Sequence, residues 1–234
     1  FPLCAVVVAL LMVEPPRERS RHPYLRGLRE GLSFAWNTPQ VRYTVLFGSV
    51  LMTGTFGPVI LMQPFLIDHG IATEWFGLFQ APIRLTAVIA AFLTTAIAAR
   101  VGRPTLFLLG PIAIAAAYAL LAVFNTPWAF ALFAAPALVQ ALVNPAVSAH
   151  LNERIPSDRR ATVLSVLQLA FSLQVAFFEP ALGFAADGIS MVAALFFAAG
   201  YLAIFVPPLL LLWRRAHPDG VTRPPLSAME AAAP

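Results

Sequence analysis

The chain contains no lysine, and all fifteen of its basic residues are arginine. This absence excludes a retinal protein, because retinal needs a lysine amine to form its Schiff base. Charged residues are also scarce, at 11% of the sequence compared with about 25% in soluble domains. Together with 59% hydrophobic residues and a mean hydropathy of +0.79, this composition indicates a protein that crosses a membrane several times.

Cysteine and histidine exclude further classes of site. The single cysteine, Cys4, gives no disulfide framework. The four histidines, His22, His69, His150 and His217, are scattered among loops and helix ends without metal-ligand spacing. We therefore expect no metal and no cofactor. The net charge of +4 does not imply a nucleic-acid partner, because the arginines lie between apolar segments and membrane topology explains them better.

The sequence divides into four parts. Residues 1–13 are interpreted as the tail of a truncated transmembrane helix, because they are apolar but too short to span and lack signal-peptide flanks. Residues 14–42 form a basic linker, which we expect to be cytoplasmic. Residues 43–213 contain six apolar spans, and residues 214–234 form a C-terminal tail. The chain is expected to be a fragment whose preceding helices are missing.

The linker contains a helical pattern of apolar residues. Four of them recur at helical spacing, namely Leu25, Leu28, Leu32 and Trp36. This spacing predicts a short amphipathic helix at the membrane surface or at a helix end. A solvated connector is the simpler interpretation of the linker as a whole.

Six segments are each long enough to cross about 30 Å of hydrocarbon. They cover residues 43–67, 75–99, 105–124, 127–150, 161–186 and 190–213. Three connections, at 68–74, 125–126 and 187–189, contain no arginine, whereas fourteen of the fifteen arginines lie in the linker, the other connections and the tail. The positive-inside rule then places the linker and the C-terminus in the cytoplasm.

Polar residues are distributed unevenly among the spans. The first, second, fourth and fifth spans have polar faces, whereas the third and sixth are almost wholly apolar and are expected to face lipid. Two triplets of opposite orientation with matching polarity are typical of inverted-repeat transporters. The fifth span is expected to start near Ser157 and Asp158, with Ser157 as the capping residue.

Two charged residues lie inside apolar spans. Arg84 is in the second and Glu179 in the fifth, where an unpaired charge costs several kcal/mol. One hypothesis is that both face a central cavity, close enough to interact. Glu179 would then bind a proton or a cationic substrate, and Arg84 an anionic group or the ionised Glu179. The alternatives are a purely structural ion pair, or a Glu179 that reaches only the outer vestibule.

Amide and hydroxyl side chains on the polar faces are candidate substrate contacts. They are Gln80, Gln140, Asn144, Gln168 and Ser172. Such groups in membrane helices also hydrogen-bond to neighbouring helices, so a structural role is the alternative for each. Gln174 lies off the polar stripe of the fifth span and is predicted to make a helix–helix contact.

Four stretches resemble parts of a known family of transporters. They are LREGLSFAWNTPQVRYTVL (28–46), QPFLIDHGI (63–71), AARVGRP (98–104) and NERIPSDRRATVLSV (152–166). In this order they resemble the C-terminal half of a major facilitator superfamily (MFS) transporter, and in particular bacterial exporters of drugs and small molecules. The resemblance implies an all-α bundle of helices seven to twelve. It also implies a missing N-terminal half as partner and a small-molecule substrate between the two halves, with alternating access.

The third of these stretches resembles a loop motif that gates the cytoplasmic side of such transporters. It keeps Arg100, Gly102 and Arg103, but has Ala99 in place of an aspartate and Thr95 in place of a glycine. This departure weakens the expectation of a gating charge relay at the loop.

The expected function is secondary active transport of a small organic molecule, as proton-coupled efflux through the bacterial cytoplasmic (plasma) membrane. The expected partners are the N-terminal half, the lipid bilayer, the substrate and protons. A non-transporting receptor or assembly subunit is the alternative. An intramembrane enzyme is disfavoured, because no span contains an aspartate pair, an HExxH motif or a GxSxG turn.

Overall fold

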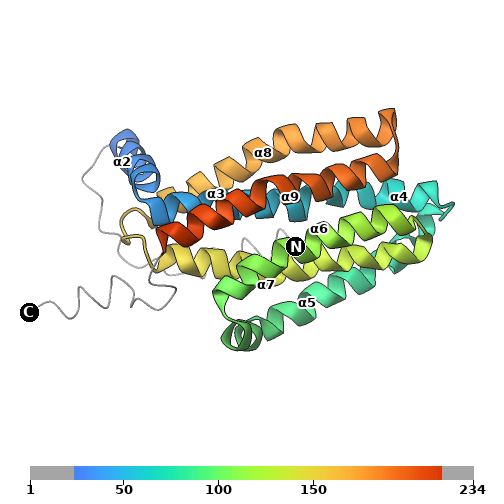
Figure 1. Ribbon diagram of the computed structural model, residues 1–234, viewed down its shortest axis with the longest axis horizontal. Coiled ribbons are helices and arrows are strands. Elements are labelled where there is room, and N and C mark those ends of the chain that lie inside the picture. The colour runs from blue at the N-terminus through green and yellow to red at the C-terminus, as the bar shows by residue number, and fades with distance from the viewer. Residues whose placement is uncertain (1–23, 218–234) are drawn as a thin grey trace, which may run out of the picture.

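The computed structural model describes residues 24–217, which form a bundle of long helices (Figure 1). The predicted tail of a preceding helix, residues 1–13, lies outside the described residues, as do residues 14–23 of the linker and residues 218–234 of the C-terminal tail. The elements, with 3₁₀-helices marked η, are α2 (Tyr24–Asn37), α3 (Pro39–Phe56), η1 (Gly57–Leu61), α4 (Met62–Asp68), η2 (Thr73–Trp75), α5 (Phe76–Val101), α6 (Arg103–Phe124), η3 (Pro127–Phe133), α7 (Ala134–Asn152), α8 (Arg160–Gly188) and α9 (Met191–Ala216).

Within residues 24–217, six helical segments of 22 to 30 residues are long and apolar enough to cross a membrane. They are Pro39–Asp68, Thr73–Thr94, Arg103–Phe124, Pro127–Asn152, Arg160–Gly188 and Met191–Ala216. These segments match the six predicted spans in order, and they confirm the all-α, multi-span fold.

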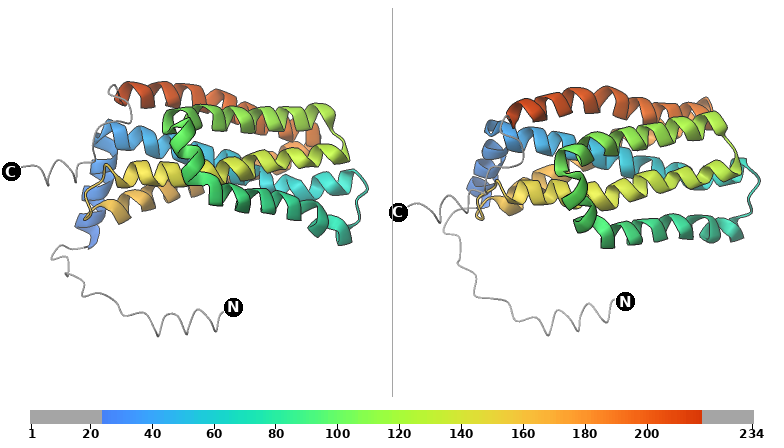
Figure 2. Two further views of the ribbon diagram at one scale, coloured as in Figure 1. Left: turned by 90° about the horizontal axis from the view of Figure 1, so that it is seen from below. Right: turned by 60° about the horizontal axis from the view of Figure 1, so that its bottom comes forward.

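The connections are sorted between the two ends of the bundle. The three without arginine, α4–α5, α6–α7 and α8–α9, lie together at one end, which we call the arginine-free end (Figures 1 and 2). The α5–α6 and α7–α8 connections, together with α2 and the end of α9, lie at the opposite, arginine-rich end. The predicted division of the arginines therefore corresponds to a real separation in space.

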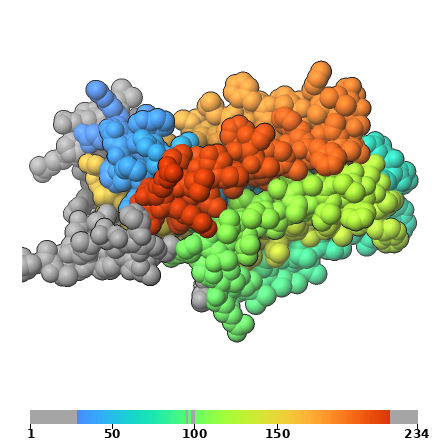
Figure 3. Space-filling model, viewed as in Figure 1, coloured from blue at the N-terminus to red at the C-terminus, as the bar shows by residue number. Residues whose placement is uncertain are grey.

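Helix α3 forms the centre of the bundle, with α9, α8 and α7 packed around it. In the apolar part of the segment Pro39–Asp68, which contains α3, 72% of the residues are buried, compared with 11% in Thr73–Thr94, which contains most of α5, and 17% in α8. Helices α8 and α5 lie at the two opposite edges of the bundle (Figures 1 and 3). Two edge helices are therefore largely uncovered within the described chain.

Helices α6 and α9 pack extensively against each other. Their windows are 50% and 33% buried, more than those of α5 and α8. The apolar character of these third and sixth spans therefore serves this mutual contact as well as any contact with lipid. The expectation that these two spans face lipid stays a prediction.

The first span changes its helix type at Gly57 and Pro58. The chain passes there from the α-helix α3 into the 3₁₀-helix η1. A β-carbon at Gly57 would lie 2.5 Å from Cδ1 of Phe178 in α8. Glycine is required at this position because the Phe178 ring is buried there.

A proline in α7 helps to join that helix to α5. Pro145 has no N–H, so the carbonyl of Ala141 lacks the donor that it would otherwise have one turn further along its own helix. The single hydroxyl hydrogen of Thr94 in α5 is shared between this carbonyl oxygen, at 3.2 Å, and the Ala90 carbonyl oxygen in its own helix, at 2.9 Å. A helix-weakening residue thus creates an interhelical hydrogen bond.

The start of the fifth span differs from the prediction. Helix α8 begins at Arg160, and its N-cap residue is Arg159, with no side-chain capping hydrogen bond. Ser157 lies in a turn closed by the hydrogen bond from the Arg159 amide to the Pro156 carbonyl. The prediction of Ser157 as the cap was therefore wrong, because this turn delays the helix by two residues.

At the arginine-free end, His69 joins two connections. Its Nδ1 lies 2.7 Å from the Phe65 carbonyl oxygen and its Nε2 lies 2.8 Å from that of Asn125. A neutral imidazole can donate to one of these acceptors, and an imidazolium can donate to both. Asn125 itself has the left-handed backbone conformation (φ 35°) that turns the chain from α6 into η3.

Candidate functional site

The polar residues predicted to contact substrate lie on α5, α7 and α8. On α5, Arg84 is exposed and Gln80 is half-buried. On α8, Gln168 and Ser172 are exposed and Glu179 is half-buried. We use the term open face for the uncovered surfaces of both edge helices, α5 and α8, taken together. These surfaces carry the two charged residues of the apolar spans, Arg84 and Glu179.

None of the seven predicted substrate- or proton-binding residues makes a hydrogen bond or ion pair within residues 24–217. They are Gln80, Arg84, Gln140, Asn144, Gln168, Ser172 and Glu179. Hydrogen-bonding groups in an apolar span are costly when they lack partners, unless they face water, a ligand or another protein segment. Their unused donors and acceptors therefore suit a surface that contacts something outside the described residues.

Gln174, two residues after Ser172 on α8, behaves in the opposite way. Its Nε2 donates to Oγ of Ser49 in α3 at 2.7 Å, and its Oε1 accepts from the Tyr201 hydroxyl in α9 at 2.5 Å. This network confirms the predicted helix–helix contact. Amides on the same helix are thus divided between those that hold the bundle together and those that remain available.

The hypothesised contact between Arg84 and Glu179 is not formed in the described chain. The two residues belong to α5 and α8, which occupy opposite edges of the bundle (Figure 1). Helix α5 packs mainly against α7, and α8 packs mainly against α3 and α9. The helical periodicity showed that each residue lay on a polar face, but it could not show that other helices separate the two.

Helix packing does bring some of the candidates onto neighbouring elements. Because α5 packs on α7, the segment with Gln80 and Arg84 is next to the helix with Gln140 and Asn144. An apolar hollow of about 350 Å³ separates α5 from η3 and the start of α7 near the arginine-free end. Its lining includes Leu78, Phe79, Pro82, Ile83, Trp128 and Phe130.

At the arginine-rich end, the predicted gating loop takes part in an ion pair. Gly102 has a positive φ of 79°, which turns the chain from α5 into α6. The next residue, Arg103, donates from both terminal nitrogens to the Glu153 carboxylate, after the end of α7. These hydrogen bonds lower the pKa of Glu153, and the positive charges of Arg103 and Arg154 lower it further. Arg100 is exposed.

The ion pair gives the predicted gating loop an acidic partner, while a gating role of the loop stays a prediction. The loop has Ala99 where the family motif has an aspartate, which weakened the case for a charge relay. Arg103 nevertheless has an acidic partner, Glu153, from the α7–α8 connection. Sequence reasoning missed Glu153, although it lies in the NERIP stretch that carries the family resemblance. Its signal was a carboxylate directly beside an arginine, Arg154, in the basic α7–α8 connection.

Next to this pair, two histidines far apart in the sequence meet. Nε2 of His150 in α7 lies 3.1 Å from Nε2 of His217, and both residues are buried. Arg154 Nη1 lies 3.1 Å from His150 Nδ1, while His217 Nδ1 lies 2.7 Å from the Trp213 carbonyl oxygen. We call this series of contacts the histidine chain.

The donors and acceptors of the histidine chain are consistent with only one protonation pattern. Arg154 can only donate, so Nδ1 of His150 must accept and its Nε2 must carry the hydrogen. That hydrogen points to Nε2 of His217, which must accept, leaving the His217 Nδ1–H to donate to Trp213. Both rings are therefore neutral when the chain is complete.

The same cluster connects the end of α9 to the centre of the bundle. The Trp213 indole donates to Oγ1 of Thr44 in α3 at 3.0 Å, and its ring stacks on His217. The sequence did not indicate this cluster, because 67 residues separate the two histidines and neither has metal-ligand spacing. Within residues 24–217, no group of three His, Cys, Asp or Glu side chains could hold a metal ion.

Six apolar helices of spanning length, sorted connections and an open face with unpartnered polar groups define a multi-pass helical membrane protein. The comparison with known families goes one step further. The family model of the Major Facilitator Superfamily matches residues 1–173 and, in a second overlapping alignment, residues 84–228. The chain belongs to this superfamily, whose members transport small molecules across membranes. Searches of curated proteins and of solved structures return no significant match.

Proposed function

We propose that this chain forms one half of a secondary active transporter that exports a small organic molecule by alternating access, coupled to protons. The observation that supports this function best is the open face. It combines unpartnered polar side chains from α5 and α8 with a minimal burial of both helices, 11% and 17% in their most apolar windows. A structural bundle has no need to leave these groups without partners.

In this proposal, a second six-helix bundle packs opposite the open face, and the substrate binds between the two bundles. Substrate sites near the middle of the membrane, at the interface between repeats, are common in transporters of this kind. We place the arginine-rich end in the cytoplasm and the protein in a bacterial plasma membrane, on the basis of the positive-inside rule.

Glu179 is the proposed proton-binding residue, because it is the carboxylate among the unpartnered groups of the open face. Arg84 is proposed to bind an anionic group of the substrate. The two roles need a contact that changes during transport, which suits residues without a fixed partner within their own half. The amides of Gln80, Gln140, Asn144 and Gln168 and the hydroxyl of Ser172 would supply hydrogen bonds that orient the substrate.

A non-transporting receptor or assembly subunit is the second candidate. It would also use the open face, but as a permanent protein interface. Permanent helix–helix contacts pair their buried polar groups once and keep them paired, whereas a transport site exchanges partners during each cycle.

The test uses the full-length protein in proteoliposomes with an imposed pH gradient. We expect substrate flux that depends on the gradient, loss of that dependence in Glu179→Gln, and at least tenfold weaker flux in Arg84→Ala. Arg215→Ala, at the end of α9, is a matched control that removes an exposed arginine outside the proposed site. Unchanged flux in both site variants would contradict the proposed roles, and absence of flux for a broad panel of organic ions would favour the receptor.

A further inference from the structure

Helix α2 lies across the arginine-rich end of the bundle, steeply inclined to the spanning helices (Figures 1 and 2). It packs against the start of α8, where Gly31 contacts Thr162 closely enough to leave no room for a β-carbon. Only one residue, Thr38, separates α2 from α3, which enters the apolar bundle at Pro39. The helix is therefore held at the boundary where the spans begin.

One edge of α2 is apolar and uncovered. Leu32 is 50% exposed and Trp36 is 62% exposed. Arg29 is also exposed, and Leu32 and Trp36 follow it at positions i+3 and i+7. The three side chains therefore share one side of the helix. Large apolar side chains flanked by arginine are typical of helices that lie in the headgroup region of a bilayer.

A second arginine is fixed beside this edge. The guanidinium carbon of Arg42, in α3, lies 5.7 Å from the centre of the Trp36 ring. Nη1 of Arg42 donates to the Trp36 carbonyl oxygen at 3.2 Å and its Nη2 donates to the Tyr43 hydroxyl at 2.8 Å. A guanidinium has five N–H donors, so donors remain after these two contacts. Arg42 is thus a preoriented cation next to an exposed indole.

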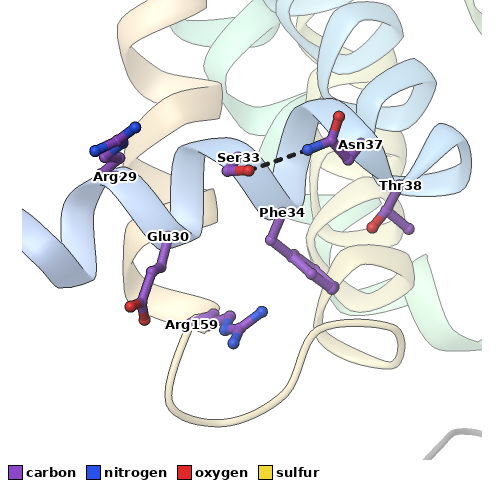
Figure 4. Close-up of a pocket in the computed structure, with 7 residues that line it drawn as sticks. All are labelled: Arg29, Glu30, Ser33, Phe34, Asn37, Thr38 and Arg159. Carbon is purple, nitrogen blue, oxygen red and sulfur yellow. Dashed lines mark hydrogen bonds between the residues drawn. The ribbon is translucent and has the colours of Figure 1, made fainter.

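The other side of α2 has a different character. In Figure 4, Glu30 and Phe34 point towards Arg159 in the α7–α8 connection, whereas Arg29 points to the opposite side of the helix. The Arg159 guanidinium lies over the Phe34 ring, 5.5 Å from its centre, and 3.6 Å from the Asp158 carboxylate. This side mixes both signs of charge, while the edge with Leu32 and Trp36 is flanked by arginine alone.

We propose that the edge formed by Arg29, Leu32, Trp36 and Arg42, the α2 edge, binds anionic phospholipid in the leaflet at the arginine-rich end. The two guanidinium groups bind phosphate oxygens of the headgroups, for which arginine's planar array of donors is well suited. Leu32 and Trp36 enter the boundary between headgroups and acyl chains, where an indole is favoured. The site is independent of the transported substrate and of the open face.

Native mass spectrometry of the full-length protein, titrated in detergent with phosphatidylglycerol or phosphatidylcholine, tests this proposal. We expect the wild-type protein to retain phosphatidylglycerol preferentially. Each cationic residue near an anionic lipid surface contributes about a fivefold change in affinity. Arg29→Gln should therefore weaken phosphatidylglycerol binding about fivefold, and Arg29→Gln combined with Arg42→Gln about 25-fold.

Two controls separate charge from position and from apolar contact. Arg159→Gln removes the same charge from the α7–α8 connection, where the guanidinium already contacts Phe34 and Asp158, and should leave phosphatidylglycerol binding unchanged. Trp36→Ala should weaken both lipids alike. Arg29 has no partner within residues 24–217, so we expect its substitution to leave the fold intact, and a thermal unfolding curve checks this. Arg42 does make hydrogen bonds, so if the double variant is unstable, the Arg29→Gln variant alone decides the outcome.

Soluble glycerol phosphate provides the last arm of the test. Without acyl chains it should not displace phosphatidylglycerol at millimolar concentration. Displacement would identify a site for soluble phosphate and overturn the lipid proposal. Equal retention of the two lipids by the wild-type protein, or an equal loss in Arg29→Gln and Arg159→Gln, would overturn it as well.

Discussion

At the scale of single residues, the polar side chains of the spans fall into two groups. Ser49, Gln174 and Tyr201 bond to one another across three helices, and Thr44 accepts from Trp213. Arg84, Glu179 and the amides around them have no partner within the described chain. Whether a polar side chain is bonded or unpartnered depends on which helix packs against it. Residue type and spacing identified the polar candidates but could not predict which of them would be bonded, except for Gln174, which lies off the polar stripe of the fifth span.

The histidine chain leads to a prediction about pH at this scale. Burial lowers the pKa of His217 below its ordinary value of 6.5; the hydrogen bond to the Trp213 carbonyl opposes this shift, and the charge of Arg154 adds to it. The folded protein therefore holds fewer protons than the unfolded protein below about pH 6.5, so stability falls as acid is added. We expect the thermal unfolding midpoint of the wild-type protein to decrease between pH 7.5 and 5.5.

His217→Asn removes the titrating group, while its amide can still donate to the Trp213 carbonyl. This variant should show a clearly smaller decrease over the same range. Glu153→Gln is the control. The lowered pKa of Glu153 gives stability that is present above its ordinary value of 4.5 and is lost only at lower pH, so this variant should keep the wild-type slope between pH 7.5 and 5.5. Equal slopes in all three proteins would contradict the histidine chain.

At the scale of elements, the sequence predicted much of the structure correctly. Apolar length alone located all six spans, and the spacing of Leu25, Leu28, Leu32 and Trp36 predicted α2. The sequence could not show which helices lie next to one another. The same hydropathy is compatible with several packing orders, so neither the separation of α5 from α8 nor the meeting of His150 and His217 followed from it. The late start of α8 also depended on a turn without a strong sequence signal.

Two glutamines on α8 provide a test at this scale. Gln174→Leu leaves the Ser49 and Tyr201 hydroxyls without their amide partner, and hydrogen bonds between membrane helices are worth about 0.6 kcal/mol each. We expect a loss of about 1 kcal/mol in unfolding free energy, measured by denaturant titration in detergent. Gln168→Leu, the matched change on the same helix, should leave stability unchanged and affect transport instead. If the two variants lose equal stability, the division of α8 into structural and available amides is incorrect.

At the scale of the whole molecule, burial is asymmetric. Helix α3 is enclosed on all sides, α6 and α9 cover one another, and α5 and α8 remain open at the two edges. An open face that carries charge cannot rest against hydrocarbon at low cost. This asymmetry is the physical reason to expect a second bundle and a wet cavity, and membership of the superfamily agrees with it.

Cysteine labelling can test the wet cavity in the full-length protein. Residues 24–217 contain no cysteine, so Cys4→Ser provides a background without other thiols in this chain. We expect Ser172→Cys on the open face of α8 to react with a membrane-impermeant maleimide, and Ile204→Cys on the exposed apolar side of α9 to react at least tenfold more slowly. Similar, slow labelling at both positions would show that the open face is not hydrated.

The hydrogen bond from Thr94 to the carbonyl that Pro145 leaves free has a consequence for movement. Prolines in membrane helices are usually considered as hinges, but this one provides the point at which a neighbouring helix is attached. While the bond is intact, a tilt of α7 carries α5 with it, and Arg84 travels with the amides of α7. Together with the packing of α5 on α7, this bond leads us to expect that the two helices move as a pair.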